Sequence, residues 1–302
     1  MRRFLTFVKV STIMIIVIFV LLRVEDTLNV NMKDFFHLFS TDDYVSPYIY
    51  VVDRETENVI YEKNSKSKAY PASLTKIMTT IVALENIDDL SAIAPIDIDT
   101  YREMVASNSS MAGFFGKEAV TYRDIVYGTI LTSGGEAANS LAIHVGGSVE
   151  GFVQMMNDKA VELGLNGTHF TNPEGLHNKK QYTTASDMAK LLDYALDNGH
   201  FKTIFTTETF QTTPTADHPD GILLKSTVLT SLNKGEQNGF EIIGGKSGTT
   251  YEAGQCWATL GLVNDREYIS IVMGAPLEDI SHPDKAQIVD TLKLYTKIKS
   301  NE

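Results

Sequence analysis

The spacing of apolar residues changes along this chain of 302 residues, and those changes restrict the folds that it can adopt. Residues 48–52 and 58–61 are short apolar runs on either side of a polar turn, a pattern that predicts a β-hairpin. Residues 85–200 repeat apolar positions at helical spacing, and after residue 200 β-branched and polar residues alternate as in strands. We therefore predict an α+β fold in which the hairpin joins the later strands in one antiparallel sheet flanked by helices.

The individual elements are predicted from the same spacing and from the glycine-rich or asparagine-rich breaks between them. The predicted helices cover residues 122–131, 136–145, 149–163, 184–196 and 283–298. The predicted strands cover residues 222–230, 240–246, 255–263 and 268–273. The helices of residues 85–200 are expected to form a mostly helical lobe, with the functional site between this lobe and the sheet.

Charge is distributed unevenly between the N-terminus and the rest of the chain. Four of the 26 basic residues lie before residue 24, in a stretch without an acidic residue. The remainder therefore carries all 38 acidic residues against 22 basic ones. Such a body repels phosphate backbones, so nucleic acid is not expected as a partner.

Residues 1–23 combine a basic start with an apolar run, which is uncharged over residues 10–22. The 13-residue uncharged run is typical of a signal peptide, but residues 4–22 can cross a thin bilayer if Lys9 snorkels. No small-x-small cleavage pattern follows, so we predict an uncleaved signal-anchor, a single transmembrane segment with an extracytoplasmic body. The alternative is secretion after cleavage. Residues 24–45 are predicted to be a spacer, and residues 46–302 the catalytic domain.

Ser73-Leu-Thr-Lys76 lies where a polar turn gives way to an apolar run of helical spacing. Residues three apart share a helix face, so the Lys76 amine can reach the Ser73 oxygen. A serine hydroxyl becomes a nucleophile when a neighbouring base takes its proton, and a partly buried lysine can be that base. The alternative is an ordinary N-cap serine and a surface lysine, since Ser65-Lys-Ser-Lys68 and Ser231-Leu-Asn-Lys234 have the same spacing.

Gly244-Gly-Lys-Ser-Gly-Thr-Thr250 follows a predicted strand, and its glycines let another backbone or a ligand approach closely. A lysine and two hydroxyls on a strand edge suit a substrate that ends in a carboxylate and adds as a strand. A phosphate-binding loop would need glycine at position 240 and a helix after Ser247. Here position 240 is phenylalanine and a further strand is predicted after the loop, so a phosphate-binding loop is excluded. A further serine, Ser133, lies in the glycine turn Leu131-Thr-Ser-Gly-Gly-Glu136 at a predicted helix start.

These three stretches resemble, in order and spacing, the motifs of the penicillin-recognising serine DD-peptidases. The chain is most similar to the low-molecular-mass D-alanyl-D-alanine carboxypeptidases (penicillin-binding proteins) of peptidase family S11. Supporting stretches are Tyr61-Glu-Lys-Asn, Gly116-Lys-Glu-Ala-Val-Thr-Tyr-Arg-Asp124, Asn172-Pro-Glu-Gly-Leu176 and Thr184-Ala-Ser-Asp-Met-Ala189. The similarity runs from about residue 48 to residue 295 and implies the DD-peptidase/β-lactamase-like fold. Many family members carry a C-terminal β-domain, which we do not expect here.

The resemblance implies a role for each matching residue. Ser73 would attack the carbonyl between the two terminal D-alanines of a peptidoglycan stem peptide, and Lys76 would accept its proton. Ser133 would pass a proton to the leaving amine with the help of Lys246. The implied substrate-binding residues are Lys246, Ser247, Gly248 and Thr249. The backbone N–H groups of Ser73 and Thr249 would form the oxyanion hole, and β-lactams would acylate Ser73 as substrate mimics.

One departure from the family pattern concerns turnover. The second motif usually ends in asparagine, and here that position is Gly135, with Asn139 one helical turn further on as a candidate substitute. This glycine motivates an alternative, a membrane-anchored binder of cell-wall peptide or β-lactam with low turnover. A second alternative is a β-lactamase-like hydrolase with Glu174 as the base, although the sequence favours a structural role for that carboxylate.

No cofactor or metal is expected. The seven histidines show no paired metal spacing, which argues against a zinc-dependent peptidase. The single cysteine, Cys256, lies in an apolar run and is expected to be a buried core residue.

Overall fold

The structure is a computed structural model that describes residues 44–301. The predicted signal-anchor and almost all of the predicted spacer lie outside these residues. Within residues 44–301, no helix combines the length and the hydropathy that crossing a bilayer requires. The described residues from 45 to 301 form one compact unit.

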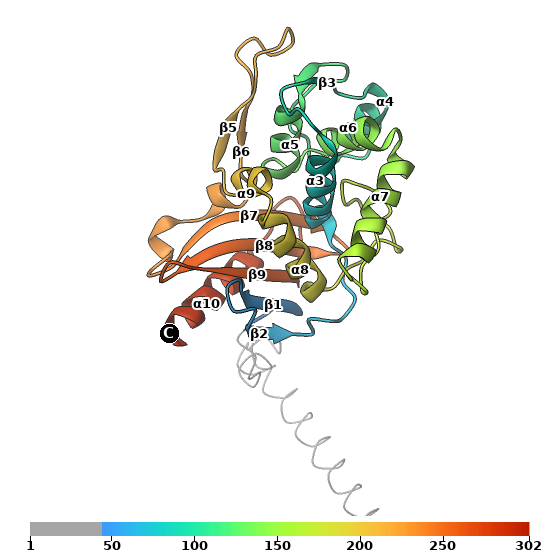
Figure 1. Cartoon of the computed structure of the whole chain (residues 1–302). Helices are drawn as coiled ribbons and strands as arrows, with labels where there is room; N and C mark the ends of the chain where they lie inside the picture. Colours follow the sequence, from blue (N-terminus) through green and yellow to red (C-terminus); the bar gives the residue numbers. More distant parts are fainter. Residues whose placement is uncertain (1–43, 302) are drawn as a thin grey trace, which may run out of the picture. The chain divides into compact units, whose positions relative to one another are not determined.

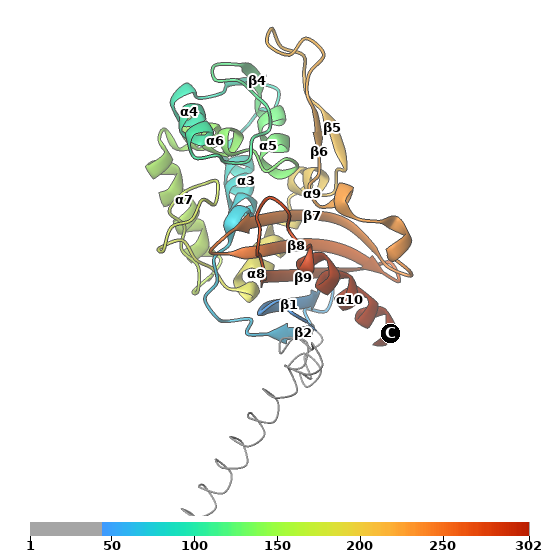
Figure 2. The same ribbon diagram turned by 180° about the vertical axis from the view of Figure 1, so that it is seen from behind.

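A five-stranded sheet forms the centre of this unit (Figures 1 and 2). Its order is β2-β1-β9-β8-β7, and every neighbouring pair is antiparallel. The strands are β1 (Tyr48–Asp53), β2 (Val59–Lys63), β7 (Glu241–Thr250), β8 (Gly254–Val263) and β9 (Arg266–Ala275). The N-terminal hairpin therefore joins the C-terminal strands, as the sequence predicts, and β7 lies at one edge.

Two helices cover opposite faces of the sheet (Figures 1 and 2). α10 (Ala286–Asn301) packs on β8 and β9, and α8 (Ala185–Leu196) packs on β9 and β1. Tyr295 of α10 is fully buried against Gly261 of β8, where any side chain would collide with its ring. Position 261 therefore requires glycine, because the Tyr295 ring occupies the space that a side chain would need.

The remaining helices form the lobe on the β7 side of the sheet (Figure 1). α3 (Thr75–Asn86) is its central helix, and every residue from Thr75 to Leu84 is buried, so it has no solvent face at that end. The other helices are α4 (Ile98–Ala106), α5 (Tyr122–Ile130), α6 (Gly135–Gly146), α7 (Val149–Glu162) and α9 (Gly199–Phe205). A small pair of strands, β3 (Ile93–Pro95) and β4 (Ala119–Thr121), completes the lobe. These elements confirm the α+β class.

Helix starts agree with the sequence where a capping side chain marks them. Thr121 and Asp124 form a reciprocal capping box at the start of α5. Thr184 accepts a hydrogen bond from the Asp187 N–H, and α8 begins one residue after the predicted start. By contrast, α10 begins at Ala286 rather than at the predicted residue 283.

One predicted strand was wrong over most of its length. Of residues 222–230, only β6 (Leu223–Lys225) is extended, and it pairs with β5 (Thr209–Gln211) in an arm outside the main sheet. The chain then turns, because the Ser226 side chain accepts a hydrogen bond from the Leu229 N–H and starts a 3-10 turn. The Phe210 ring of the arm stacks on the Tyr127 ring of α5 at 3.7 Å, which holds the arm against the helical lobe.

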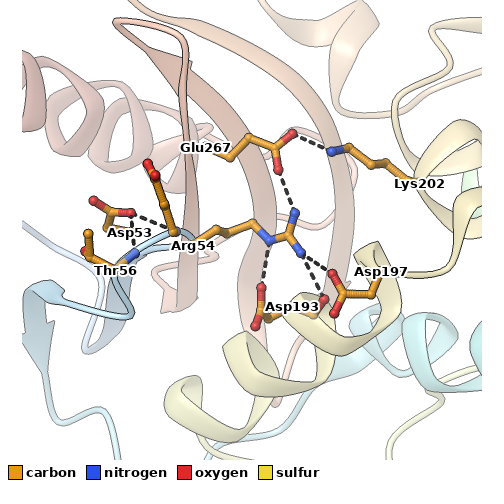
Figure 3. Close-up of polar contacts among 8 residues, drawn as sticks. Asp53, Arg54, Thr56, Asp193, Asp197, Lys202 and Glu267 are labelled. Carbon is orange, nitrogen blue, oxygen red and sulfur yellow. Dashed lines mark hydrogen bonds and ion pairs between the residues drawn. The ribbon is translucent and has the colours of Figure 1, made fainter.

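An ion-pair network ties the β1–β2 turn to β9 and to two helices (Figure 3). Arg54 donates to Asp193 at 2.6 Å, to Asp197 at 2.8 Å and to Glu267 at 2.6 Å. Lys202 of α9 donates to the other oxygen of Glu267 at 2.5 Å. One guanidinium thus fixes the end of the sheet to α8, because its planar fork can serve several carboxylates at once.

Candidate active site

Ser73 lies in a single 3-10 turn, η1 (Ala72–Leu74), directly before α3. The preceding residue, Ala72, has a φ of 45°, a left-handed conformation that strains a residue with a side chain. The turn packs against β7, where a Cβ at Gly248 would come within 2.9 Å of the Ser73 nitrogen. Only glycine lets the strand edge and the nucleophile turn lie this close together.

Lys76 is one turn further on, and its amine faces the serine. Its Nζ lies 3.1 Å from the Ser73 Oγ and donates a 2.5 Å hydrogen bond to the backbone carbonyl of Glu174. The side chain is 1% exposed, and burial lowers the pKa of Lys76 to about 8, although the Glu174 and Glu136 carboxylates oppose the shift. Roughly a tenth of Lys76 is therefore neutral at about pH 7 and able to accept a proton.

Ser133 and Lys246 form a second hydroxyl–amine pair. Lys246 Nζ donates to the Ser133 Oγ at 2.9 Å and to the Ser247 carbonyl at 2.7 Å. Ser133 has a φ of 62°, so a second strained residue lies at the site. Lys246 is fully buried, and burial, followed by the nearby charge of Lys76, holds the pKa of Lys246 well below its usual range.

The edge of β7 carries the remaining predicted residues. Ser247 is partly exposed and its Oγ lies 2.7 Å from the Thr227 Oγ1, while Thr249 is exposed and Gly248 is buried against the serine turn. A cleft of about 640 Å³ runs from Ser73 past Thr249 to the β7–β8 turn. This volume is in the range that holds a small ligand or short peptide.

The space beside Gly135 is already occupied. A Cβ at this position would come within 2.5 Å of the Ser109 Oγ and 3.0 Å of the Met104 sulfur. Asn139, which the sequence suggests as a substitute, instead donates to the Gly135 carbonyl at 3.0 Å and to the Glu174 carboxylate at 3.1 Å. The loop residue Ser109 lines the cleft where an asparagine side chain would begin.

Glu174, for which the sequence favours a structural role, lies at the site. Its carbonyl accepts from Lys76, its carboxylate accepts from Asn139, and it lines the cleft although it is only 5% exposed. Gly175 permits this approach, because its φ is 91° and a Cβ there would lie 2.1 Å from the Ala72 carbonyl. The turn Asn172-Pro-Glu-Gly was the available signal, since it needs a glycine at a left-handed position.

Neither the cysteine nor the histidines considered as metal ligands belong to the two hydroxyl–amine pairs of this site. Cys256 is a buried core residue, as predicted, and burial raises the pKa of its thiol to about 12. Residues 44–301 contain no cluster of three or more histidine, cysteine or acidic side chains arranged to hold a metal.

The fold and the site together define a serine acyl-transfer site. A hydroxyl with an adjacent buried amine provides a nucleophile and its base. A second hydroxyl–amine pair can pass a proton, and an exposed strand edge can hold a peptide backbone.

Comparison with known proteins identifies the family. Residues 39–277 match the Peptidase_S11 model, described as D-alanyl-D-alanine carboxypeptidase, and the chain belongs to this family. It is 30% identical over 245 residues to the D-alanyl-D-alanine carboxypeptidase DacA of Haemophilus influenzae, covering 78% of this chain and 59% of that protein. It is 36% identical over 139 residues to DacF of Bacillus subtilis, covering 46% of this chain and 36% of that protein.

Comparison with solved structures agrees with this family assignment. The fold matches the crystal structure of the Streptomyces K15 DD-transpeptidase with a TM-score of 0.75 and 27% identity, over 87% of this chain and 100% of that one. A D-alanyl-D-alanine carboxypeptidase of Mycobacterium tuberculosis H37Rv matches with a TM-score of 0.72, 25% identity, 85% of this chain and 92% of that one. The chain spans about a third to three fifths of the length of the first curated relatives that it matches.

Proposed function

We propose that the chain is a serine-type D-alanyl-D-alanine carboxypeptidase that removes the terminal D-alanine from peptidoglycan stem peptides through an acyl-enzyme on Ser73. The observation that carries the proposal is the 3.1 Å contact between the Ser73 Oγ and the buried amine of Lys76, whose pKa is about 8. An amine with this pKa can take the serine proton near neutral pH.

Acylation begins when the substrate lies along the free edge of β7. Its carboxylate would be held by Lys246, Ser247 and Thr249, and the approach of that negative charge raises the pKa of Lys246, which burial lowers. Lys76 then accepts the Ser73 proton as the oxygen attacks the carbonyl carbon. The N–H groups of Ser73 and Thr249 would stabilise the oxyanion, at about 10² to 10³ in rate for each donor.

The leaving amine of D-alanine must gain a proton. Ser133 would donate it, because its Oγ accepts a hydrogen bond from the Lys246 amine, which can replace the proton that Ser133 loses. Water then hydrolyses the ester on Ser73 and releases the shortened peptide. β-Lactams would follow the same route, since they present a reactive carbonyl and a carboxylate to the same residues.

A fluorescent penicillin and a D-alanine release assay on the full chain in detergent test the proposal. We expect labelling with slow release of the label, together with release of D-alanine from a pentapeptide, and neither with Ser73→Ala. Rapid loss of the label without D-alanine release would indicate a β-lactamase. Labelling without turnover would indicate the low-turnover binder that Gly135 motivates. Equal labelling of wild type and Ser73→Ala would refute the assignment of the nucleophile.

We also propose that residues 1–23 anchor the chain in the cell membrane as a single uncleaved segment, with the catalytic domain outside the cytoplasm. The support is the basic start, the apolar run and the lack of a cleavage pattern. Membrane fractionation and N-terminal sequencing of the chain from a bacterial host test this. A soluble product that begins after residue 23 would show secretion after cleavage instead.

A further inference from the structure

Glu174 is a buried residue beside the nucleophile, and its carboxylate has no role in acylation. Its backbone carbonyl lies 3.5 Å from the Ser73 Oγ and 2.5 Å from the Lys76 Nζ. Lys76 already takes the serine proton, and Ser133 already serves the leaving group. The fold nevertheless keeps Glu174 only 5% exposed, which is unfavourable unless the charged group is needed there.

The carboxylate is held in one place. Asn139 of α6 donates to its Oε2 at 3.1 Å, and Asn139 is fixed in turn because the same Nδ2 donates to the Gly135 carbonyl at 3.0 Å. The backbone on either side of Glu174 is also held. The Pro173 carbonyl accepts from the Thr79 hydroxyl at 2.6 Å, and the Gly175 N–H donates to the Asn172 side chain at 2.8 Å.

The held carboxylate can still bind water. Among the residues that the structure describes, only Asn139 donates a side-chain hydrogen bond to it, whereas a carboxylate has about four acceptor positions. Glu174 also lines the cleft together with Ser73. A water in the cleft can therefore contact the carboxylate beside the position of an ester on the Ser73 Oγ.

We propose that Glu174 is the general base that activates water for hydrolysis of the acyl-enzyme, and that Asn139 orients its carboxylate. The inference rests on the proposed function, because it needs an ester on Ser73. The esters concerned are those of a peptide ending in D-alanine and of an opened β-lactam. Lys76 is thus the base for acylation, and Glu174 is the base for deacylation.

Atoms and protons balance in this step. Glu174 takes one proton from the water while the water oxygen bonds to the ester carbon. The bond between that carbon and the Ser73 Oγ then breaks, which leaves the free acid. Lys76, which lies 3.1 Å from the Ser73 Oγ, returns to that oxygen the proton that it took during acylation. Glu174 then releases its proton to solvent, and Lys246 regains from solvent the proton that it supplied for the leaving amine. The serine hydroxyl, the amine and the carboxylate are then all as they were before the cycle.

The chemistry sets the pH dependence of this step. Burial raises the pKa of Glu174, while the charge of Lys76 and the Asn139 hydrogen bond oppose the rise. A base works only when it is deprotonated, so deacylation should slow at acidic pH with a limb above the usual range of a glutamate. Without Glu174, that limb should disappear.

The test measures acylation and deacylation separately in the full chain, with a fluorescent penicillin as the probe. Acylation is followed by the rate of labelling at about pH 9, where Lys76 is neutral, and deacylation by loss of the label after excess probe is removed. Glu174→Gln keeps the shape of the side chain and can still accept from Asn139, so it removes the base alone. We expect deacylation to fall by about 10² or more with acylation changed less than about threefold.

Matched variants separate the base from other effects. Glu252→Gln removes a carboxylate that lines the same cleft and should leave deacylation unchanged. Asn139→Ala should slow deacylation less than Glu174→Gln does, and Glu174→Asp should recover part of the rate. If Glu174→Gln deacylates at the wild-type rate, or slows acylation and deacylation equally, the inference is wrong although the proposed function stands. If wild type does not label at Ser73, the proposed function itself fails.

Discussion

The acylation rate should rise about tenfold between about pH 7 and about pH 9, because it depends on neutral Lys76. Burial lowers the pKa of Lys76 to about 8. At about pH 7 roughly 9% of such a lysine is neutral, compared with about 0.03% of a lysine with an ordinary pKa. The buried position therefore increases the amount of active base about 300-fold at this pH.

The assay is the second-order rate of labelling by a fluorescent penicillin over the range of about pH 6 to 9.5, corrected for hydrolysis of the probe alone. The logarithm of the rate should rise with a slope near one below about pH 8 and level off above it. Glu174→Gln gives an internal check, because loss of the carboxylate that opposes the shift should move the limb to lower pH.

Two results would refute this reasoning. A rate that is flat from about pH 6 to 9 would show that Lys76 is not the group whose deprotonation limits acylation. A limb near the ordinary pKa of lysine, about 10.5, would show that burial does not perturb the amine. In either case the short contact with Ser73 would be structural and the base would have to be sought elsewhere.

Three further substitutions test the energetics. Gly135→Asn should lower the unfolding free energy by about 1 to 3 kcal/mol, because the new Cβ would meet the Ser109 hydroxyl at 2.5 Å. Adding Ser109→Gly to this variant should recover part of the loss, as measured by thermal melts. Lys246→Met should abolish labelling and raise the melting temperature at about pH 7. The pKa of Lys246 is lower in the folded state than in the unfolded state, so the protonated lysine destabilises the fold. The stability of the wild type should therefore rise with pH between the folded-state pKa and the unfolded-state pKa of Lys246. Arg54→Met should cost about 2 kcal/mol, a fall of about 4 to 8 °C, with unchanged labelling at low temperature.

The local part of the site could be predicted from the sequence. Ser73 and Lys76 face each other because residues three apart share a helix face, and this rule holds whatever surrounds the helix. The strand before Lys246 was also predicted, although β7 continues to Thr250 and includes the whole glycine-rich stretch. The hairpin of residues 48–61 joins the later strands because its alternating apolar residues need a sheet to cover them.

The tertiary part could not be predicted from the sequence. Lys76 contacts the carbonyl of Glu174, 98 residues away, and a backbone carbonyl gives no signal in the identity of its residue. The arm of β5 and β6 was missed because each strand has only three residues, too few for a periodic pattern. The complete burial of Lys246 depends on the packing of the helical lobe on β7, and composition favours an exposed lysine.

The electrostatics of the two lysines distinguish catalysis from binding. A protein that only holds a carboxylate gains most from a lysine that stays fully charged and partly solvated. Here both Lys76 and Lys246 are buried, and each has a lowered pKa, which weakens the attraction to an anion. The same burial makes each amine a better proton carrier near neutral pH. Since burying them costs stability and improves only proton transfer, the arrangement favours turnover over binding alone, even with glycine at position 135.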